Sequence, residues 1–280
     1  MNYTQTTAPT QYIEAGAIKF AYRRFGKETG IPLILFGHFR ASMENWDPKV
    51  TDGLGKDRPI ILFSNTGIGL TNGKTPNNVS KMAHYAITFI DALGLEKVDL
   101  LGFSLGGFIA QEITLARPEL VRYLVLAGTG PEGGKDMLEY IPEVTRVATN
   151  EFPVMEDFLY LFFPAGEKAQ KAGREFWERR NERKTDLDLP SSMEVMEAQA
   201  NAIGSWGIPK DEYPKLAQIK QPVLITNGNN DIMVPTINSY ILFQNIPNSK
   251  IILYPDSGHG FLFQYPDEFV TDVNLFLNQA

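Results

Sequence analysis

The chain of 280 residues contains no cysteine and only three histidines. Without cysteine it can form no disulfide framework, no thiolate zinc site and no cysteine-nucleophile catalytic centre. A positive charge excess is also missing, because 26 Lys and Arg residues stand against 33 Asp and Glu residues, for a net charge of −7. Proteins that track nucleic-acid phosphates need a positive field, so the sequence argues against that class.

Long apolar runs are absent as well. No stretch approaches the roughly 18 apolar residues that would cross a bilayer. The N-terminal region lacks the basic start and apolar run of a secretory signal. We therefore expect a cytoplasmic protein without a membrane span, although a cysteine-free chain is equally compatible with an oxidising compartment. The hydrophobic share of 43% is that of an ordinary globular protein with a buried core.

Short apolar runs recur along the chain and are interpreted as strands. Residues 12–25 alternate around Gly16, whereas most later runs are continuous. Continuous apolar runs are typical of strands buried on both faces of a parallel sheet. The runs after the alternating region are residues 31–36, 59–63, 98–103, 123–127, 222–226 and 250–254.

The segments between these runs have helical spacing, as in 78–93, 106–116, 236–244 and 266–278. Strands that alternate with helices predict an α/β fold, in which helices flank a mostly parallel central sheet.

Residues 131–214 break this alternation, because they contain helical stretches and no convincing buried strand. We expect a helical cap there, inserted between two late strands, and a core formed by residues 1–130 and 215–280. The charge-dense stretch 166–184 is interpreted as a solvated helix face around Phe176 and Trp177. The other helical stretches are 137–148, 154–163 and 192–203.

The sharpest motif is the pentapeptide Gly102-Phe103-Ser104-Leu105-Gly106, at the junction of a predicted strand and a predicted helix. A G-x-S-x-G sequence in that position forms a strained turn that exposes the serine hydroxyl at the carboxyl edge of the sheet. Glycines are needed because side chains would collide with the tight backbone. The alternative is a glycine-rich turn that holds an incidental serine.

A serine hydroxyl is a weak nucleophile and needs a base. His259 follows the last predicted strand and Asp231 follows the strand before it, so both should lie at the same sheet edge as Ser104. We predict Ser104 as the nucleophile, His259 as the base and Asp231 as the acid that orients it. The alternatives are a surface histidine, a capping role for Asp231, and Glu132 as the acid; Asp256 is interpreted as a turn residue.

A tetrahedral intermediate requires two N–H donors. The residue after the nucleophile, Leu105, supplies one, and Phe39 in the loop after residues 31–36 should supply the other. No arginine pair that would select a carboxylate or phosphate is evident. Side chains expected to line a substrate pocket, where most aromatics would otherwise belong to the core, are Phe36, His38, Phe103, Phe158 and Phe162.

These motifs resemble the α/β-hydrolase superfamily, whose triad follows the chain order Ser, Asp, His. The chain is most similar to the branch of serine esterases, cofactor-free haloperoxidases and C–C hydrolases. The resemblance implies a helical cap that closes a mostly apolar pocket over Ser104, with no cofactor and no metal. It is carried by residues 31–37, 102–107, 127–130, 227–235 and 257–260.

Two positions depart from that family. Most members have His-Gly before the oxyanion donor, whereas this chain has Gly37-His38, which leaves the loop conformation open. The His38 ring would then lie at the pocket rim or be a hydrogen-bonded loop residue. Relatives often carry Asp and Arg at the positions of Ser64 and Thr66, and we expect these neutral residues to have a structural effect.

Serine as the nucleophile argues against the epoxide hydrolases and haloalkane dehalogenases of this fold, which use aspartate. The main prediction is a serine hydrolase that acts on a small or medium, largely apolar ester through an acyl-enzyme. The alternatives are perhydrolase or haloperoxidase activity, C–C hydrolysis or lyase chemistry on the same triad, or a non-catalytic ligand-binding protein. The expected partner is a small-molecule substrate, not nucleic acid, and a homodimer is left open.

Overall fold

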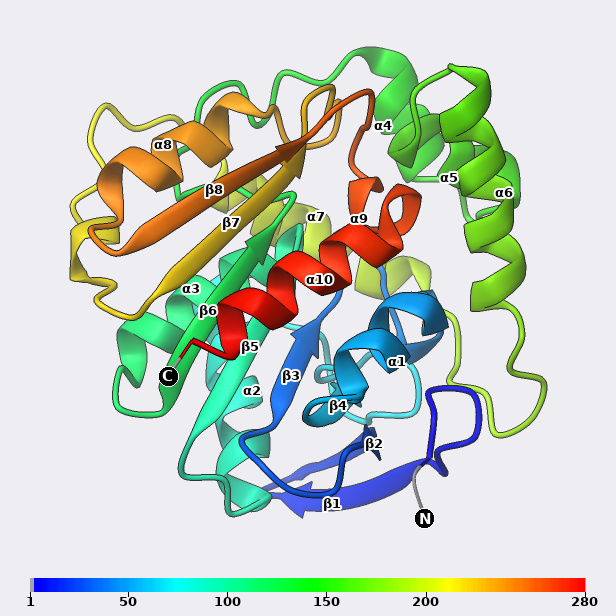
Figure 1. Cartoon of the computed structure of the whole chain (residues 1–280), viewed down its shortest axis with the longest axis vertical. Helices are drawn as coiled ribbons and strands as arrows, with labels where there is room; N and C mark the ends of the chain where they lie inside the picture. Colours follow the sequence, from blue (N-terminus) through cyan, green and yellow to red (C-terminus); the bar gives the residue numbers. More distant parts are fainter. Residues whose placement is uncertain (1–2, 280) are drawn as a thin grey trace.

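The computed structural model describes residues 3–279, which form an eight-stranded sheet with helices on both faces (Figure 1). The strand order is β1-β2-β4-β3-β5-β6-β7-β8. Strand β2 runs antiparallel to β1 and β4, and the remaining pairs are parallel, which confirms the mostly parallel sheet. The strands are β1 Gln11–Ala15, β2 Ile18–Gly26, β3 Leu33–Phe36, β4 Pro59–Phe63, β5 Val98–Phe103, β6 Val121–Ala127, β7 Val223–Gly228 and β8 Ser249–Tyr254.

Burial follows the sequence pattern in the inner strands but not in β8, whose continuous apolar run also predicts a strand buried on both faces. Strand β8 is half-buried or exposed at every residue but its last, because it forms an edge of the sheet. Strands β3, β4, β5 and β7 are buried at every residue, as continuous apolar runs predict for strands covered on both faces. The edge strand β1 alternates between half-buried and exposed residues before it ends at a buried alanine. It turns into β2 at Gly16, whose positive φ of 63° suits a glycine.

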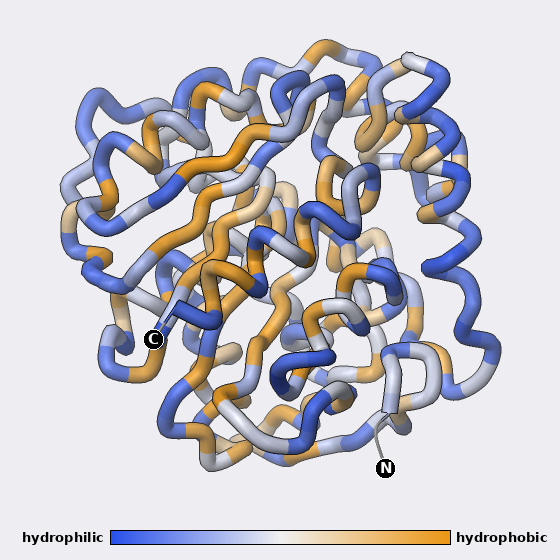
Figure 2. The backbone as a smooth tube through the Cα atoms, in the orientation of Figure 1, coloured by the Kyte–Doolittle hydropathy of each residue, from blue (hydrophilic) through white to orange (hydrophobic). Residues whose placement is uncertain are grey.

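The core lies in two layers, one on each face of the sheet. Helices α1 (Pro48–Gly55) and α10 (Pro266–Leu277) lie in front of the sheet in Figure 1, and α2 (Val79–Ala92) and α3 (Leu105–Ala116) lie behind it. Along β3, Ile34 packs into the layer behind and Leu35 into the layer in front. Figure 2 shows hydrophobic residues concentrated in the strands and hydrophilic residues on the outer sides of the helices. The remaining core helices are α8 (Ile237–Asn245) and α9 (Phe261–Gln264).

Helix ends obey local rules. Helix α2 begins where the Asn78 side chain accepts the backbone N–H of Lys81, and it stops before Gly94, whose φ is +68°. The expected helix 137–148 is wrong at its start, because Ile141 is extended and helix α4 begins only at Pro142. A residue before proline is disfavoured in helical conformation, which explains the late start.

Residues 128–222, called the inserted segment below, connect β6 to β7 and contain four α-helices (Figure 1). Helices α4, α5 and α6 lie beyond the carboxyl ends of β7 and β8 in that view. In the part of the chain that the structure describes, no helix is long and apolar enough to cross a membrane. The four helices are α4 Pro142–Ala148, α5 Met155–Phe162, α6 Glu167–Arg180 and α7 Met193–Trp206.

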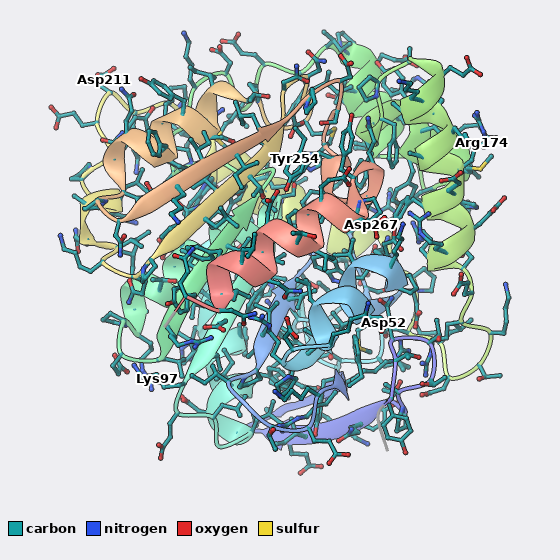
Figure 3. All side chains as sticks on the ribbon, viewed as in Figure 1. Asp52, Lys97, Arg174, Asp211, Tyr254 and Asp267 are labelled. Carbon is teal, nitrogen blue, oxygen red and sulfur yellow. The ribbon has the colours of Figure 1, made fainter. Side chains whose placement is uncertain are left out.

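The prediction of a solvated face for the stretch 166–184 is correct only for one side of α6. Arg174 lies on the exposed outer side, as Figure 3 shows. Arg179 instead donates from Nη2 to the buried carboxylate of Asp47 at 2.6 Å. Phe176 is fully buried rather than the centre of a solvated face. The inward side of α6 therefore fastens the inserted segment to the core.

Candidate active site

Ser104 occupies a sharp turn between β5 and α3. Its φ of 58° and ψ of −120° are strained for a residue other than glycine. The neighbouring glycines are required, since a Cβ on Gly106 would lie 2.1 Å from the carbonyl oxygen of Phe36. A Cβ on Gly102 would lie 2.4 Å from the carbonyl oxygen of Gly106. The strained turn that the pentapeptide predicts is therefore present.

His259 and Asp231 are in direct contact. His259 Nδ1 lies 2.7 Å from Asp231 Oδ2, and both side chains are buried. The other carboxylate oxygen accepts the backbone N–H groups of Met233 at 2.8 Å and Val234 at 3.0 Å. These bonds fix the carboxylate, so Nδ1 carries the proton that it shares with Oδ2 and Nε2 keeps a free lone pair.

Ser104 and His259 line the same cavity, as does Phe39. The His259 ring packs on Phe103 and Phe162, with centroid separations of 4.9 Å and 5.2 Å. This packing holds the ring beside the turn that carries the serine. The three residues that the sequence places at one sheet edge are thus gathered in one site.

The loop after β3 is a tight turn. The N–H of Ala41 donates to the carbonyl of His38 at 3.0 Å, and Arg40 has a positive φ of 64°. The turn keeps Phe39 in the cavity wall despite the Gly37-His38 order. Leu105 is the first residue of α3, so its N–H has no acceptor within the helix.

The cavity has a volume of about 430 Å³. Phe158, Phe162 and His38 line it, as the sequence predicts, but Phe36 and Phe103 are not among its lining residues. Phe36 packs edge-on against Phe63 in the core, with centroids 5.3 Å apart. Phe103 is fully buried behind the rings of His38 and His259. The other apolar lining residues are Val147, Ala148, Phe152, Pro153, Leu161, Pro190 and Met233.

One charged residue of this wall, Arg180, was missed by the sequence reasoning. It ends α6 and its guanidinium lies over the rings of Phe158 and Trp177, at 4.6 Å and 4.7 Å from the centroids. Its Nε and Nη1 are buried and have no hydrogen-bond partner within residues 3–279. Burial lowers the pKa of this guanidinium to about 10, so it remains charged at neutral pH. No spacing in the charged stretch 166–184 distinguishes it from its neighbours.

The acid whose charge acts on Arg180 already has other hydrogen-bond partners. Glu44 raises the pKa of Arg180 but accepts from Arg23 Nη2 at 2.6 Å and from the backbone N–H of Asp188 at 2.8 Å. Within residues 3–279, Arg180 therefore lines the cavity without a direct ion pair, although Glu44 acts on its charge, and a buried charge without a direct partner is costly for the fold.

The other acids considered from the sequence lie elsewhere. Glu132 forms ion pairs with Lys210 at 2.6 Å and Lys215 at 2.8 Å. Asp256 occupies a turn with a φ of +45°, in agreement with its interpretation as a turn residue. Asp231 is the acid in contact with His259.

Comparison with known proteins identifies the family. The model of the alpha/beta hydrolase fold matches residues 31–266, and the chain belongs to this family. A solved structure of an alpha/beta hydrolase fold protein from Chitinophaga pinensis is similar with a TM-score of 0.94 and 40% identity, and the match covers 99% of this chain and 100% of that chain.

Two curated relatives are similar over most of their length. The first is the 2-hydroxy-6-oxononadienedioate/2-hydroxy-6-oxononatrienedioate hydrolase of Klebsiella pneumoniae, 27% identical over 91% of this chain and 88% of that protein. The second is the pimeloyl-[acyl-carrier protein] methyl ester esterase of Legionella pneumophila, 26% identical over 89% of this chain and 95% of that protein. These relatives are hydrolases, which supports hydrolase activity for the family without defining a substrate.

Proposed function

We propose that this protein is a serine hydrolase that cleaves an ester-type substrate through Ser104, His259 and Asp231. The observation that carries the proposal is the contact of 2.7 Å between His259 Nδ1 and Asp231 Oδ2, with His259 lining the cavity that Ser104 also lines. Because Nδ1 donates to the carboxylate, Nε2 is the basic atom available to the serine.

The proposed cycle begins when His259 Nε2 takes the Ser104 proton and Oγ attacks the carbonyl carbon. The backbone N–H groups of Phe39 and Leu105 stabilise the oxyanion. His259 then gives its proton to the departing alkoxide, and an acyl-enzyme remains. Water loses a proton to His259 and attacks the acyl carbon; the bond to Ser104 Oγ then breaks, His259 returns the proton to Oγ, and the acid leaves. Asp231 stabilises the imidazolium in both halves.

We further propose that the helices of residues 131–214 act as a cap over Ser104. The apolar part of the cavity wall comes mostly from this segment, including Val147, Phe158 and Leu161. A volume of about 430 Å³ suits a small or medium substrate. The pocket is not wholly apolar, because Arg180 also lines it. The charge of Arg180 favours a substrate with one anionic group remote from the reacting carbonyl.

A second candidate is hydrolysis of a C–C bond beside a carbonyl group. Arg180 favours it, because the Klebsiella relative is named for dicarboxylate substrates. The same nucleophile and base would serve that reaction, so the two functions differ in the substrate rather than in the triad.

The test is hydrolysis of p-nitrophenyl esters of increasing acyl length, with Ser104→Ala as the control. We expect turnover that peaks at one acyl length and is lost in the variant, whereas turnover retained in Ser104→Ala would contradict the proposal. A fluorophosphonate probe that labels the wild-type protein but turns over no ester would move the assignment to C–C hydrolysis. A protein that is neither labelled nor active would support the ligand-binding alternative.

A further inference from the structure

His38, in the wall of the cavity, carries a buried hydrogen-bond acceptor that is not used. Only 8% of the residue is exposed, and it lines the cavity together with Ser104 and His259. Within residues 3–279, its Nε2 has no hydrogen-bond partner. A buried polar atom without a partner destabilises a fold, so such an atom in a cavity wall indicates a partner that arrives with the ligand.

The tautomer of His38 follows from its other ring nitrogen. Nδ1 lies 2.8 Å from the carbonyl oxygen of Phe39, and a carbonyl oxygen can only accept. Nδ1 therefore carries the proton, and Nε2 presents a lone pair. The pKa of His38 is lowered to about 3, chiefly by burial; the hydrogen bond to the Phe39 carbonyl raises the pKa, and the nearby charges of His259 and Arg180 lower it. The ring is neutral at physiological pH and Nε2 only accepts.

The surroundings of the ring restrict what can approach Nε2. The ring meets three phenylalanine rings edge-on, those of Phe158, Phe162 and Phe103, with centroids 6.1 Å, 5.1 Å and 5.6 Å away. Benzene rings offer no O–H or N–H donor. An ether oxygen, a carboxylate oxygen or a fluorine atom carries no proton to donate. Placed next to Nε2, its lone pair would repel the lone pair of the nitrogen.

The position of His38 relates it to the reacting carbonyl. It directly precedes Phe39, whose N–H is the proposed oxyanion donor, and it shares the rings of Phe103 and Phe162 with His259. The His38 ring thus belongs to the same cavity wall as the proposed oxyanion donor and the base. A substrate donor that reaches it must lie near the carbonyl carbon under attack.

We propose that His38 Nε2 binds a hydroxyl or amide N–H on the carbon adjacent to the scissile carbonyl, so that the preferred acyl groups are 2-hydroxy or 2-amido acyl groups. This inference rests on the proposed serine hydrolase function. A site built around a substrate donor discriminates strongly against an analogue that lacks it, because the buried acceptor is then left unpaired.

The test compares p-nitrophenyl esters of 2-hydroxybutyrate and 2-fluorobutyrate. Fluorine is similar to a hydroxyl in size and also withdraws electrons, but it carries no proton to donate. For the wild-type protein we expect kcat/KM to favour the hydroxy ester at least tenfold. In His38→Leu this ratio should fall at least tenfold, and His38→Gln, whose amide oxygen accepts, should restore part of it.

Two outcomes would overturn the proposal: a wild-type ratio near one, or the same ratio in His38→Leu as in the wild-type protein. If His38→Leu loses activity equally on both esters, the ratio is unchanged and this is the second outcome. It would indicate a damaged oxyanion loop rather than a lost acceptor.

A binding measurement separates this proposal from the proposed function. Calorimetry on Ser104→Ala, with and without His38→Leu, compares the Kd values of the same two esters. We expect tighter binding of the hydroxy ester that disappears with His38→Leu, even if the wild-type protein turns over neither ester. Equal affinities in Ser104→Ala would overturn the role of His38, while failure of turnover alone would count against the hydrolase.

Discussion

The Ser64 hydroxyl, just after β4, donates a hydrogen bond to the carboxylate of Asp188 in the inserted segment. The same carboxylate accepts the backbone N–H groups of Met43 at 3.2 Å and Leu70 at 2.6 Å. From the family resemblance we expect an aspartate at the position of Ser64, and a structural effect where a neutral residue replaces it. Here the carboxylate comes from the inserted segment, so Asp188 ties that segment to two loops of the core.

Replacing Asp188 with alanine should destabilise the protein. The Ser64 hydroxyl and the two backbone N–H groups would lose a buried acceptor, which costs on the order of 1 kcal/mol each. We expect the free energy of unfolding in urea to fall by about 2–4 kcal/mol. The exposed Asp211 (Figure 3) provides the control, since Asp211→Ala should change stability by less than about 0.5 kcal/mol. Equal effects of the two substitutions would contradict the role assigned to Asp188.

Replacing Asp231 with asparagine should remove most of the activity while the fold persists. The amide can donate to Nδ1 and so favours the wrong histidine tautomer, and it no longer stabilises the imidazolium. By analogy with the serine protease triad, we expect kcat to fall by about 10³–10⁴-fold with little change in KM.

The matched control for Asp231→Asn is Glu132→Gln, which removes the other acid considered from the sequence. Glu132 is held by Lys210 and Lys215 and does not contact His259. We expect nearly full kcat in this variant. A larger loss of kcat in Glu132→Gln than in Asp231→Asn would show that the orienting acid is misassigned.

The residues that the sequence predicts best are those whose positions follow from strand ends. Ser104, Asp231 and His259 each come just after a parallel strand, and the carboxyl ends of such strands meet at one edge. Arg180 and Asp188 belong to the inserted segment, where no strand register relates one residue to another. Which side of α6 faces inward depends on how the segment packs on the core, and local periodicity in a stretch so rich in charge does not reveal it.

Arg180→Met should abolish a preference for anionic esters. We expect the wild-type protein to favour the p-nitrophenyl monoester of glutarate over the valerate ester. Hydrogen bonds to a charged group contribute roughly 1.5–3 kcal/mol, so the ratio of kcat/KM should fall by about 10–100-fold in the variant. Arg174→Met, on the outer side of α6 (Figure 3), should leave the ratio unchanged. An unaltered ratio in Arg180→Met would mean that the cation does not meet the substrate.

His38 should also make stability depend on pH. Its pKa is near 3 in the folded protein because of burial, against about 6.5 in the unfolded chain. Between these values the unfolded chain binds a proton that the folded protein does not, so the free energy of unfolding falls as the pH decreases, with a slope of about 1.4 kcal/mol per pH unit.

His38→Gln removes the protonation of His38 and leaves every other titratable group in place. The difference in the free energy of unfolding between the wild-type protein and the variant therefore reports the effect of His38 alone. Asp52, whose pKa burial raises to about 6, contributes with the opposite sign, but it is present in both proteins and cancels in the difference. We expect the advantage of the wild-type protein over His38→Gln in urea unfolding to shrink steadily from pH 6.5 to pH 4.5. Parallel stability curves over that range would mean that the buried ring is not held neutral, and Nε2 would then not be the obligatory acceptor on which 2-hydroxy selectivity depends.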